Sequence, residues 1–267
     1  MLLLRSLFTR AYNAVHRWIW PVVRTPSASP ELKEIADRAA FMPSDISDHL
    51  ATIFSEAVAV KPRLIVELGV RGGESRFVLE RVARVTGAFL VSVDLDDCSA
   101  VCTESPRWPF VRSDDILFAK IFRDWCTQRR IEPRIDVLFV DTSHLYEHTV
   151  QEIDAWFPHL SDDCKVIFHD TNIKLFYRRR DGTVEPGWNN KRGVIRAIEE
   201  HLGTRLNERM DFVTIAQGWL IRHWSHCSGL TTMERLRRST KNTEDPAREA
   251  QGSYSAPGAA PGSRNPV

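Results

Sequence analysis

Residues 63–75 read RLIVELGVRGGES, a short apolar run that contains the acid Glu67 at its end and is followed by three glycines. An apolar run of this length that passes through glycines into a helical pattern is typical of a buried strand turning directly into a helix. Glycines at such a turn adopt positive φ angles and let the backbone approach a ligand closely. The stretch therefore predicts the first strand-to-helix unit of an α/β domain, with a ligand at the turn.

The same unit recurs along the chain. Strands are predicted at residues 63–67, 88–94, 110–111, 135–141, 165–170 and 213–221 (extending to 224), with helices at 75–85, 118–130, 148–159 and 193–202. The near-continuous apolar sequence IDVLFVD at 135–141 indicates a strand buried on both faces. The alternation predicts an α/β fold over residues 61–235: a doubly wound, mostly parallel, Rossmann-like sheet with helices on both faces.

The segments on either side of this domain differ from it in composition. Residues 1–24 carry four arginines and no acid, with apolar residues at helical spacing, so we expect a basic amphipathic helix. Peripheral contact with a membrane and packing against the domain or a partner subunit are both open interpretations of that helix. Residues 25–60 are predicted to form a linker and two N-terminal helices that cover one edge of the domain. Residues 236–267, rich in Ser, Pro, Gly and Ala, are predicted to be a disordered tail.

Overall composition excludes several classes of protein. The chain has 36 Lys and Arg against 35 Asp and Glu, so its net charge of +1 gives no reason to expect a nucleic-acid partner. No apolar run reaches the roughly 18–20 residues of a membrane-spanning helix. The five cysteines contain no C-x-x-C pair, which argues against a disulfide framework and favours a reducing compartment. We expect a cytoplasmic protein, with attachment to the inner membrane surface as an alternative, and a homo-oligomer is compatible with the sequence.

An acid lies at the carboxyl end of four predicted strands: Glu67, Asp94, Asp141 and Asp170. Ligands of doubly wound sheets bind beyond these strand ends, and a carboxylate at the position of Asp94 can accept hydrogen bonds from a ribose diol. The glycine spacing is G-x-x-G-G instead of the dinucleotide pattern G-x-G-x-x-G. Glu67 would repel a pyrophosphate but would suit the cationic end of S-adenosylmethionine. The alternative interpretation is a tight turn with no ligand.

A second group of polar residues follows two neighbouring strands. His144 lies three residues after Asp141, while His169 and Asp170 end the next strand and Asn172 follows them. Because the ends of parallel strands are adjacent, these side chains are expected in one crevice. Such oxygen ligands suit a hard divalent cation, and a neutral His144 can take the proton of a hydroxyl group. The alternative is that Asp141 and Asp170 cap helices and His169 is a core histidine.

At these residues the chain resembles a known family. The segments ELGVRGGES, VSVDLDD, FVDTSHLYEH and VIFHDTN are similar to those of the class I S-adenosylmethionine-dependent methyltransferases, in the branch of the cephalosporin-hydroxylase-like proteins and sugar O-methyltransferases. The resemblance covers about residues 61–230 and implies S-adenosyl-L-methionine as cofactor. It implies cofactor contacts from Glu67, Gly69, Gly73 and Ser75 on the methionine side, from Asp94 at the ribose, and from Ser113 and Asp114 near the adenine.

The resemblance also implies roles for the second group. Related sugar O-methyltransferases place an acid, a histidine three residues later and an acid pair at the next strand end, a pattern that Asp141, His144 and Asp170 match. His169 replaces the first acid of the pair, which removes one negative charge. The implied ligands of Mg²⁺ or another divalent cation are Asp141, His169 and Asp170, with Asn172 as a further candidate, and His144 is the implied catalytic base. The charge change leaves a softer metal, or none, as alternatives.

The segment that follows, residues 174–192, is long and carries Lys174, Tyr177, Arg178, Arg179, Arg180, Trp188 and Arg192. We expect it either to form a lid over an acceptor molecule, because arginine binds anionic groups and tryptophan stacks on sugar rings, or to be a solvated charged run.

The sequence thus predicts an S-adenosylmethionine-dependent O-methyltransferase that acts on a hydroxyl of a sugar or glycosylated small molecule, with metal assistance. The alternatives are a non-catalytic cofactor-binding scaffold of the same fold and a dinucleotide-dependent oxidoreductase. Catalysis requires the carboxylates of Asp141 and Asp170 to face one cavity beside the Glu67 loop.

Overall fold

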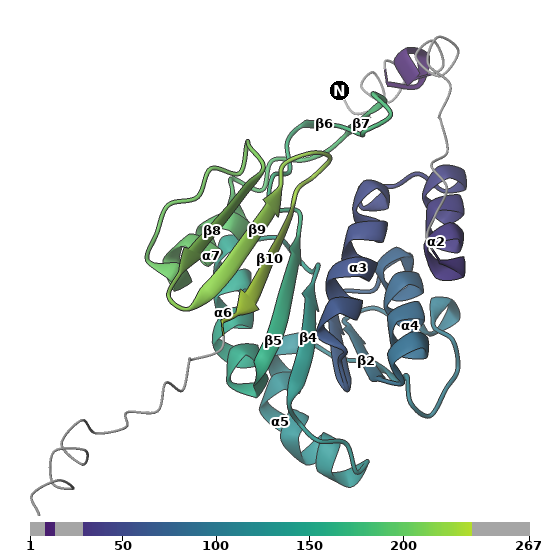
Figure 1. Ribbon diagram of the computed structural model, residues 1–267, viewed down its shortest axis with the longest axis vertical. Helices are drawn as coiled ribbons and strands as arrows, with labels where there is room; N and C mark the ends of the chain where they lie inside the picture. The colour runs from purple at the N-terminus through teal and green to yellow at the C-terminus, as the bar shows by residue number, and fades with distance from the viewer. Residues whose placement is uncertain (1–8, 14–28, 237–267) are drawn as a thin grey trace, which may run out of the picture. The chain divides into compact units, whose positions relative to one another are not determined.

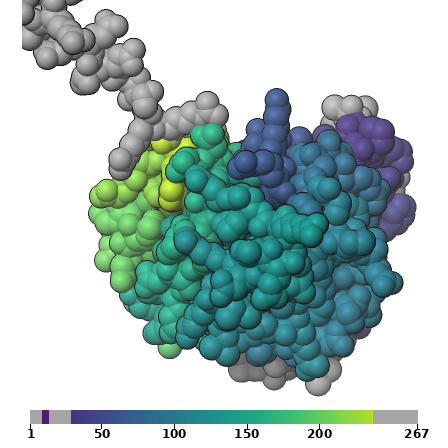
Figure 2. Space-filling model, turned by 90° about the horizontal axis from the view of Figure 1, so that it is seen from below, coloured from purple at the N-terminus to yellow at the C-terminus, as the bar shows by residue number. Residues whose placement is uncertain are grey.

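A computed structural model describes residues 9–13 and 29–236, and its centre is an eight-stranded sheet (Figure 1). The strands of this sheet are β1 (Leu64–Leu68), β2 (Phe89–Asp94), β3 (Phe110–Arg112), β4 (Ile135–Val140), β5 (Leu160–His169), β8 (Phe212–Ala216), β9 (Trp219–Trp224) and β10 (Leu230–Arg235). Their order is β3-β2-β1-β4-β5-β10-β9-β8. Figure 2 shows the green C-terminal segments on one side of the molecule and the blue N-terminal segments on the other, with teal segments between them.

Strands β1 to β5 pair in parallel, which confirms the predicted doubly wound, mostly parallel sheet. The last three strands are antiparallel to their neighbours. The segment expected as one strand over residues 213–224 is instead a hairpin, because Gln217 and Gly218 both have positive φ angles and form a tight two-residue turn. Strand β10 was not predicted, since its sequence LTTMER contains no apolar run.

Helices cover both faces of the sheet. Helices α3 (Leu50–Val60) and α4 (Glu74–Thr86), with α2 (Pro30–Phe41) outside them, cover one face, where Ile53 and Leu79 join a core cluster with Ile65 and Phe139. Helices α5 (Asp115–Gln128), α6 (Tyr146–Trp156) and α7 (Gly193–Leu202) contribute to the core cluster on the opposite side of the strands. The predicted N-terminal helices α2 and α3 therefore pack on one face of the sheet.

Three short 3₁₀ turns complete the elements: η1 (Ser47–His49), η2 (Ser99–Val101) and η3 (Phe157–His159). The two predicted N-terminal helices are separated near Met42, in the stretch between α2 and η1. Helix α2 begins where Ser29 accepts a hydrogen bond from the Leu32 amide and Pro30 occupies the first turn, so the predicted linker ends at Ser29.

The predicted N-terminal helix and C-terminal tail fall largely outside the described residues. Residues 9–13 are helical, and Asn13 at their end pairs with strand β7 (Val184–Pro186), donating to the Val184 carbonyl at 2.8 Å and accepting from the Val184 amide at 2.7 Å. Within the described part of the chain, no helix combines the length and apolar character needed to cross a membrane. Membrane contact through residues 1–24 stays a prediction.

Strand β1 is buried along its whole length although it contains an acid. Glu67 lies opposite Ser92 of β2, whose hydroxyl donates to Glu67 Oε2, and Arg76 in turn donates to the Ser92 oxygen at 2.7 Å. Burial, only partly offset by these neighbours, raises the pKa of Glu67 to about 7. The folded protein therefore holds a proton on Glu67 at pH values where the unfolded chain has lost it.

We predict that Glu67 makes the protein less stable as the pH rises. A carboxyl group whose folded-state pKa is about 7, above its ordinary 4.5, contributes fully below pH 4.5 and loses this contribution as the pH rises through 7. The loss amounts to about 3 kcal/mol. Urea unfolding of the cofactor-free protein between pH 5 and 8 should show this slope, and Glu67→Gln should remove it.

Glu104→Gln, at an exposed glutamate, serves as the control for that measurement and should retain the slope. An unchanged slope in Glu67→Gln would contradict the assignment to Glu67.

Candidate functional site

A pocket of about 200 Å³ opens at the carboxyl ends of strands β1, β2 and β4. It is lined by Gly69, Arg71, Val93, Asp94, Leu95, Ser113, Asp114, Asp115, Asp141, Thr142, Ser143 and His148. Four of the predicted cofactor residues (Gly69, Asp94, Ser113 and Asp114) lie in this wall, together with the predicted metal ligand Asp141. The pocket is where a ligand of a doubly wound sheet is expected.

Gly69 is required by a close approach of two loops. Its φ is +86°, and a Cβ at this position would lie 2.1 Å from the Asp141 carbonyl oxygen. Any larger residue would push the loop after β1 away from the loop after β4. Gly73 has a φ of +81° and begins α4, which turns the chain from the pocket into the helix.

Asp94 is held ionised at the pocket wall. Its Oδ2 accepts from the Val70 amide at 2.7 Å and the Arg71 amide at 3.1 Å, and its Oδ1 accepts from the Asp96 amide at 2.9 Å. Burial alone would raise the pKa of Asp94, but these three backbone donors lower the pKa below its ordinary value. An ionised carboxylate here fits the ribose of the cofactor.

Two predicted cofactor residues lie outside the pocket wall, and Asp114 in that wall has a second, structural role. Glu67 and Ser75 are buried and are not among the residues that line the pocket. Asp114 accepts from the Leu117 amide at 2.8 Å and so caps α5, which explains why this helix begins at Asp115, three residues before its predicted start.

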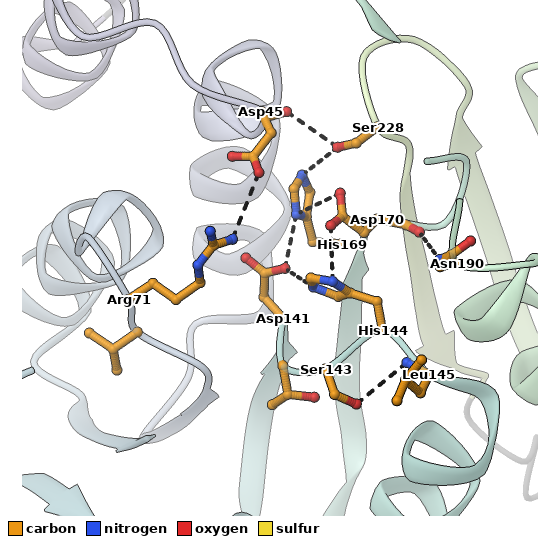
Figure 3. A network of polar contacts seen from close by, with 12 residues as sticks. Asp45, Arg71, Asp141, Ser143, His144, Leu145, His169, Asp170, Asn190 and Ser228 are labelled. Carbon is orange, nitrogen blue, oxygen red and sulfur yellow. Dashed lines mark hydrogen bonds and ion pairs between the residues drawn. The ribbon is translucent and has the colours of Figure 1, made fainter. Parts of the chain in front are cut away.

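Two histidines converge on one carboxylate oxygen (Figure 3). Asp141 Oδ1 lies 2.9 Å from His144 Nε2 and 3.0 Å from His169 Nδ1. The other ring nitrogen of His144, Nδ1, lies 3.2 Å from Asp170 Oδ2. His144 therefore bridges the two acids, and the predicted convergence of Asp141, His144, His169 and Asp170 is present in the structure.

The charges in this group are tightly interdependent. Burial would raise the pKa of Asp141, but the adjacent His169 and His144 hold that pKa well below its usual range. Burial would lower the pKa of His169, but the charges of Asp141 and Asp170 outweigh it and raise the pKa to about 10. The pKa of His144 is also raised, since its contacts with Asp141 and Asp170 overcome its burial.

The backbone at two of these residues is strained. His144 and Asp170 both have positive φ angles, 58° and 55°, which residues other than glycine rarely adopt. Such strain persists only where surrounding contacts enforce it, and it is concentrated at functional sites. Here the two strained residues are in direct contact, since the His144 ring lies against the Asp170 carboxylate.

His169 is anchored on its far side. Its Nε2 lies 2.9 Å from the hydroxyl of Ser228, which precedes β10 and donates to the Asp45 carbonyl at 3.3 Å. Asn172 points elsewhere: its side-chain amide donates to the Ser225 carbonyl at 2.5 Å. Of the predicted ligands, His169 thus contacts the Asp141 carboxylate, whereas Asn172 is engaged with the loop between β9 and β10.

The donor set fits a divalent cation. One ligand atom from each of Asp141, His144 and Asp170 lies within 4.8 Å of the others. Asp170 is almost fully buried, and its Oδ1 makes no hydrogen bond to any described residue. The two carboxylates of this set are the kind of oxygen ligand that Mg²⁺ and Mn²⁺ prefer.

The segment after β5 is a small hairpin and not an open loop. Strand β6 (Phe176–Arg178) pairs with β7, and two of the arginines in this segment have structural partners. Arg179 is buried, and Arg192 forms ion pairs with Glu199 and Glu208. The interpretation of these two arginines as solvated or ligand-binding is therefore wrong.

Trp188 in the same segment does face the site. Its ring centroid lies 5.8 Å from that of His144 at an interplanar angle of 44°, and it is 40% exposed. An exposed indole beside the bridging histidine provides a flat apolar surface next to the pocket.

Sequence reasoning missed the residues that support the site from a distance. Ser228 and Asp45 lie in segments that carried no motif. Glu152 and Asp115 form a further cluster with His148 at the pocket wall. Burial and the nearby Asp115 raise the pKa of Glu152 to about 8. The helical spacing of His148 and Glu152 was the one available signal, because residues four apart share a helix face.

Comparisons with known proteins agree with this geometry. Residues 66–171 match the family model described as "Methyltransferase domain". No curated protein matches the sequence at a significant level. A Klebsiella pneumoniae protein described as an O-methyltransferase has a similar structure, with TM-score 0.51 and 13% identity over 89% of this chain and 100% of its own.

Two further solved structures share the fold. A Staphylococcus aureus protein described as a caffeoyl-CoA O-methyltransferase has TM-score 0.51 and 10% identity, over 86% of this chain and 100% of its own. The Podospora anserina methyltransferase, solved with S-adenosylhomocysteine, has TM-score 0.51 and 13% identity over 86% of this chain and 96% of its own. Over residues 66–171 the chain is thus similar to a methyltransferase domain, and its fold is that of these solved methyltransferase structures.

Proposed function

We propose that the protein transfers the methyl group of S-adenosylmethionine to a hydroxyl of a sugar or a glycosylated small molecule. The observation that carries the proposal is the position of His144, which bridges Asp141 and Asp170 beside the cofactor pocket with Trp188 against its ring. Asp141 belongs to both the pocket wall and the bridged group, so an acceptor next to His144 lies near the methyl donor. Alignment of donor and acceptor contributes most of the acceleration in such a transfer.

Asp141 and Asp170 are the proposed ligands of a divalent cation. Such a cation supplies a Lewis acid that lowers the pKa of the acceptor hydroxyl. His169 donates to Asp141 from behind and is itself fixed by Ser228, so we assign it to orienting the carboxylate. This assignment differs from the direct ligand role implied by the family resemblance.

His144 is the proposed catalytic base. Its ring lies between the two carboxylates and beside Trp188. A cation held by Asp141 and Asp170 would offset their negative charge, favour the neutral imidazole and leave one ring nitrogen free to take the proton of the acceptor hydroxyl. The methyl group moves from sulfur to oxygen in one displacement, so the C–S bond breaks as the C–O bond forms and the proton passes to His144.

Trp188 supports a carbohydrate acceptor. The exposed indole offers its face beside His144, and aromatic faces of this kind pack against the apolar side of a sugar ring. Two arginines of this segment, Arg179 and Arg192, are paired with acids and so are less available to an anionic acceptor.

The direct test is incubation with methyl-labelled S-adenosylmethionine and a panel of sugars and glycosides. We expect label in a sugar methyl ether, loss of transfer after treatment with a chelator, and recovery with Mg²⁺ or Mn²⁺. Transfer that is indifferent to chelation would contradict the metal, and transfer to non-sugar hydroxyls alone would contradict the acceptor class.

We predict that His144→Ala lowers kcat by about 10²–10⁴-fold while the Kd of S-adenosylmethionine changes little, because His144 acts on the acceptor proton. Turnover kinetics and calorimetric titration of the cofactor measure the two effects. His201→Ala, at an exposed histidine of α7, is the matched control and should keep normal turnover. Near-normal kcat in His144→Ala would assign the proton to another group.

We predict that Trp188→Ala raises the KM of the sugar acceptor by about 3- to 10-fold with a smaller effect on kcat, because the indole binds the acceptor without touching the reacting atoms. Trp188→Phe, which keeps an aromatic face, should recover most of the affinity. Equal KM values for all three proteins in steady-state kinetics would show that Trp188 does not contact the acceptor.

A further inference from the structure

A second cluster of ligand-type side chains lies at the wall of the cofactor pocket and has no part in the proposed reaction. His148 and Glu152 are one turn apart on α6, and Asp115 is the first residue of α5. His148 Nε2 lies 3.3 Å from Asp115 Oδ1 and 3.7 Å from Glu152 Oε1. One ligand atom from each of the three lies within 4.8 Å of the others.

Two oxygens of this cluster are buried and unpaired. Asp115 is 8% exposed and Glu152 is 1% exposed, yet Asp115 Oδ2 and Glu152 Oε2 have no hydrogen-bond partner in the described part of the chain. A buried acceptor without a partner costs about 1–3 kcal/mol, and more when it is charged. Two such atoms in one cluster indicate that a positively charged group completes it.

We propose that Asp115, His148 and Glu152 form a binding site for a divalent transition metal of the Zn²⁺ class. Ligands at about 2.1 Å from a tetrahedral ion are about 3.4 Å from one another. The two separations from the imidazole nitrogen, 3.3 and 3.7 Å, bracket this spacing. One imidazole and two carboxylates are ligands that Zn²⁺ accepts, and the mixed set distinguishes this site from an all-oxygen site for Mg²⁺.

The surroundings support the ligands. The Thr142 hydroxyl donates to Glu152 Oε1 at 2.6 Å and so fixes the orientation of that carboxylate. Outer hydrogen bonds of this kind commonly orient metal ligands. Because Asp115, Thr142 and His148 also line the cofactor pocket, an ion here would join the start of α5, the first turns of α6 and the loop after β4 into one wall. Its fourth ligand position would face the pocket.

The test counts bound zinc in the full-length chain after removal of metal with a chelator and dialysis against Zn²⁺. The Asp170→Asn protein, in which the site at Asp141 and Asp170 is disabled, should still bind roughly one zinc per chain. Adding His148→Gln or Glu152→Gln in that background should weaken zinc binding by at least about 10-fold. Glu147→Gln, at an exposed acid on the same helix, should leave the zinc content unchanged.

The same substitutions are also made in the otherwise unchanged chain, so that the test does not depend on the folding of Asp170→Asn. His148 is partly exposed, so His148→Gln should fold normally and should lose one zinc relative to the parent chain. Cobalt absorption spectra provide an independent readout, since the visible bands should change in His148→Gln and persist in Glu147→Gln. Absence of zinc from Asp170→Asn, or equal zinc affinity in the parent and His148→Gln chains, would overturn the proposal.

Discussion

The site depends on one carboxylate oxygen, Asp141 Oδ1, that two imidazole rings share. Asp141 follows the central strand β4 directly, and the Gly69 loop rests against its backbone carbonyl. The same residue therefore bounds the cofactor pocket and fixes both histidines. Because this oxygen is largely removed from water, its attraction to each ring is strong. The shared contact therefore fixes the positions of the two rings relative to each other.

The parallel half of the fold was predictable because each element there has a local cause. Strands β1, β2 and β4 are short apolar runs, helix α4 begins after Gly73, and helix α5 begins after its capping residue Asp114. Strand β5 was predicted too short, because its first half, LSDDC, contains polar residues; of this half only Leu160 pairs with β4, and a register shift separates it from Lys165. The antiparallel strand β10 lacked a pattern of its own and is specified by its two neighbours.

The sequence was enough to predict which residues form the candidate site, but not which partners their side chains contact. Spacing at strand ends was enough to bring Asp141, His144, His169 and Asp170 together, because parallel strands end at one edge. It could not tell that His169 is held from behind by Ser228 or that Asn172 turns toward the loop before β10, since both partners lie more than fifty residues away. The positive φ angles of His144 and Asp170 likewise have no signature in residue type.

The side chain of Asn13 imitates a peptide group. It gives Val184 both the donor and the acceptor that a neighbouring strand would give, and so it occupies the outer edge of the β6–β7 hairpin. Removal of the residues up to and including Asn13 would expose the edge of strand β7, which is close in sequence to Trp188. Exposed edges of this kind recruit other chains. A form trimmed past Asn13 would therefore be prone to self-association, and the segment that carries Asn13 is best kept in any preparation used for enzymology.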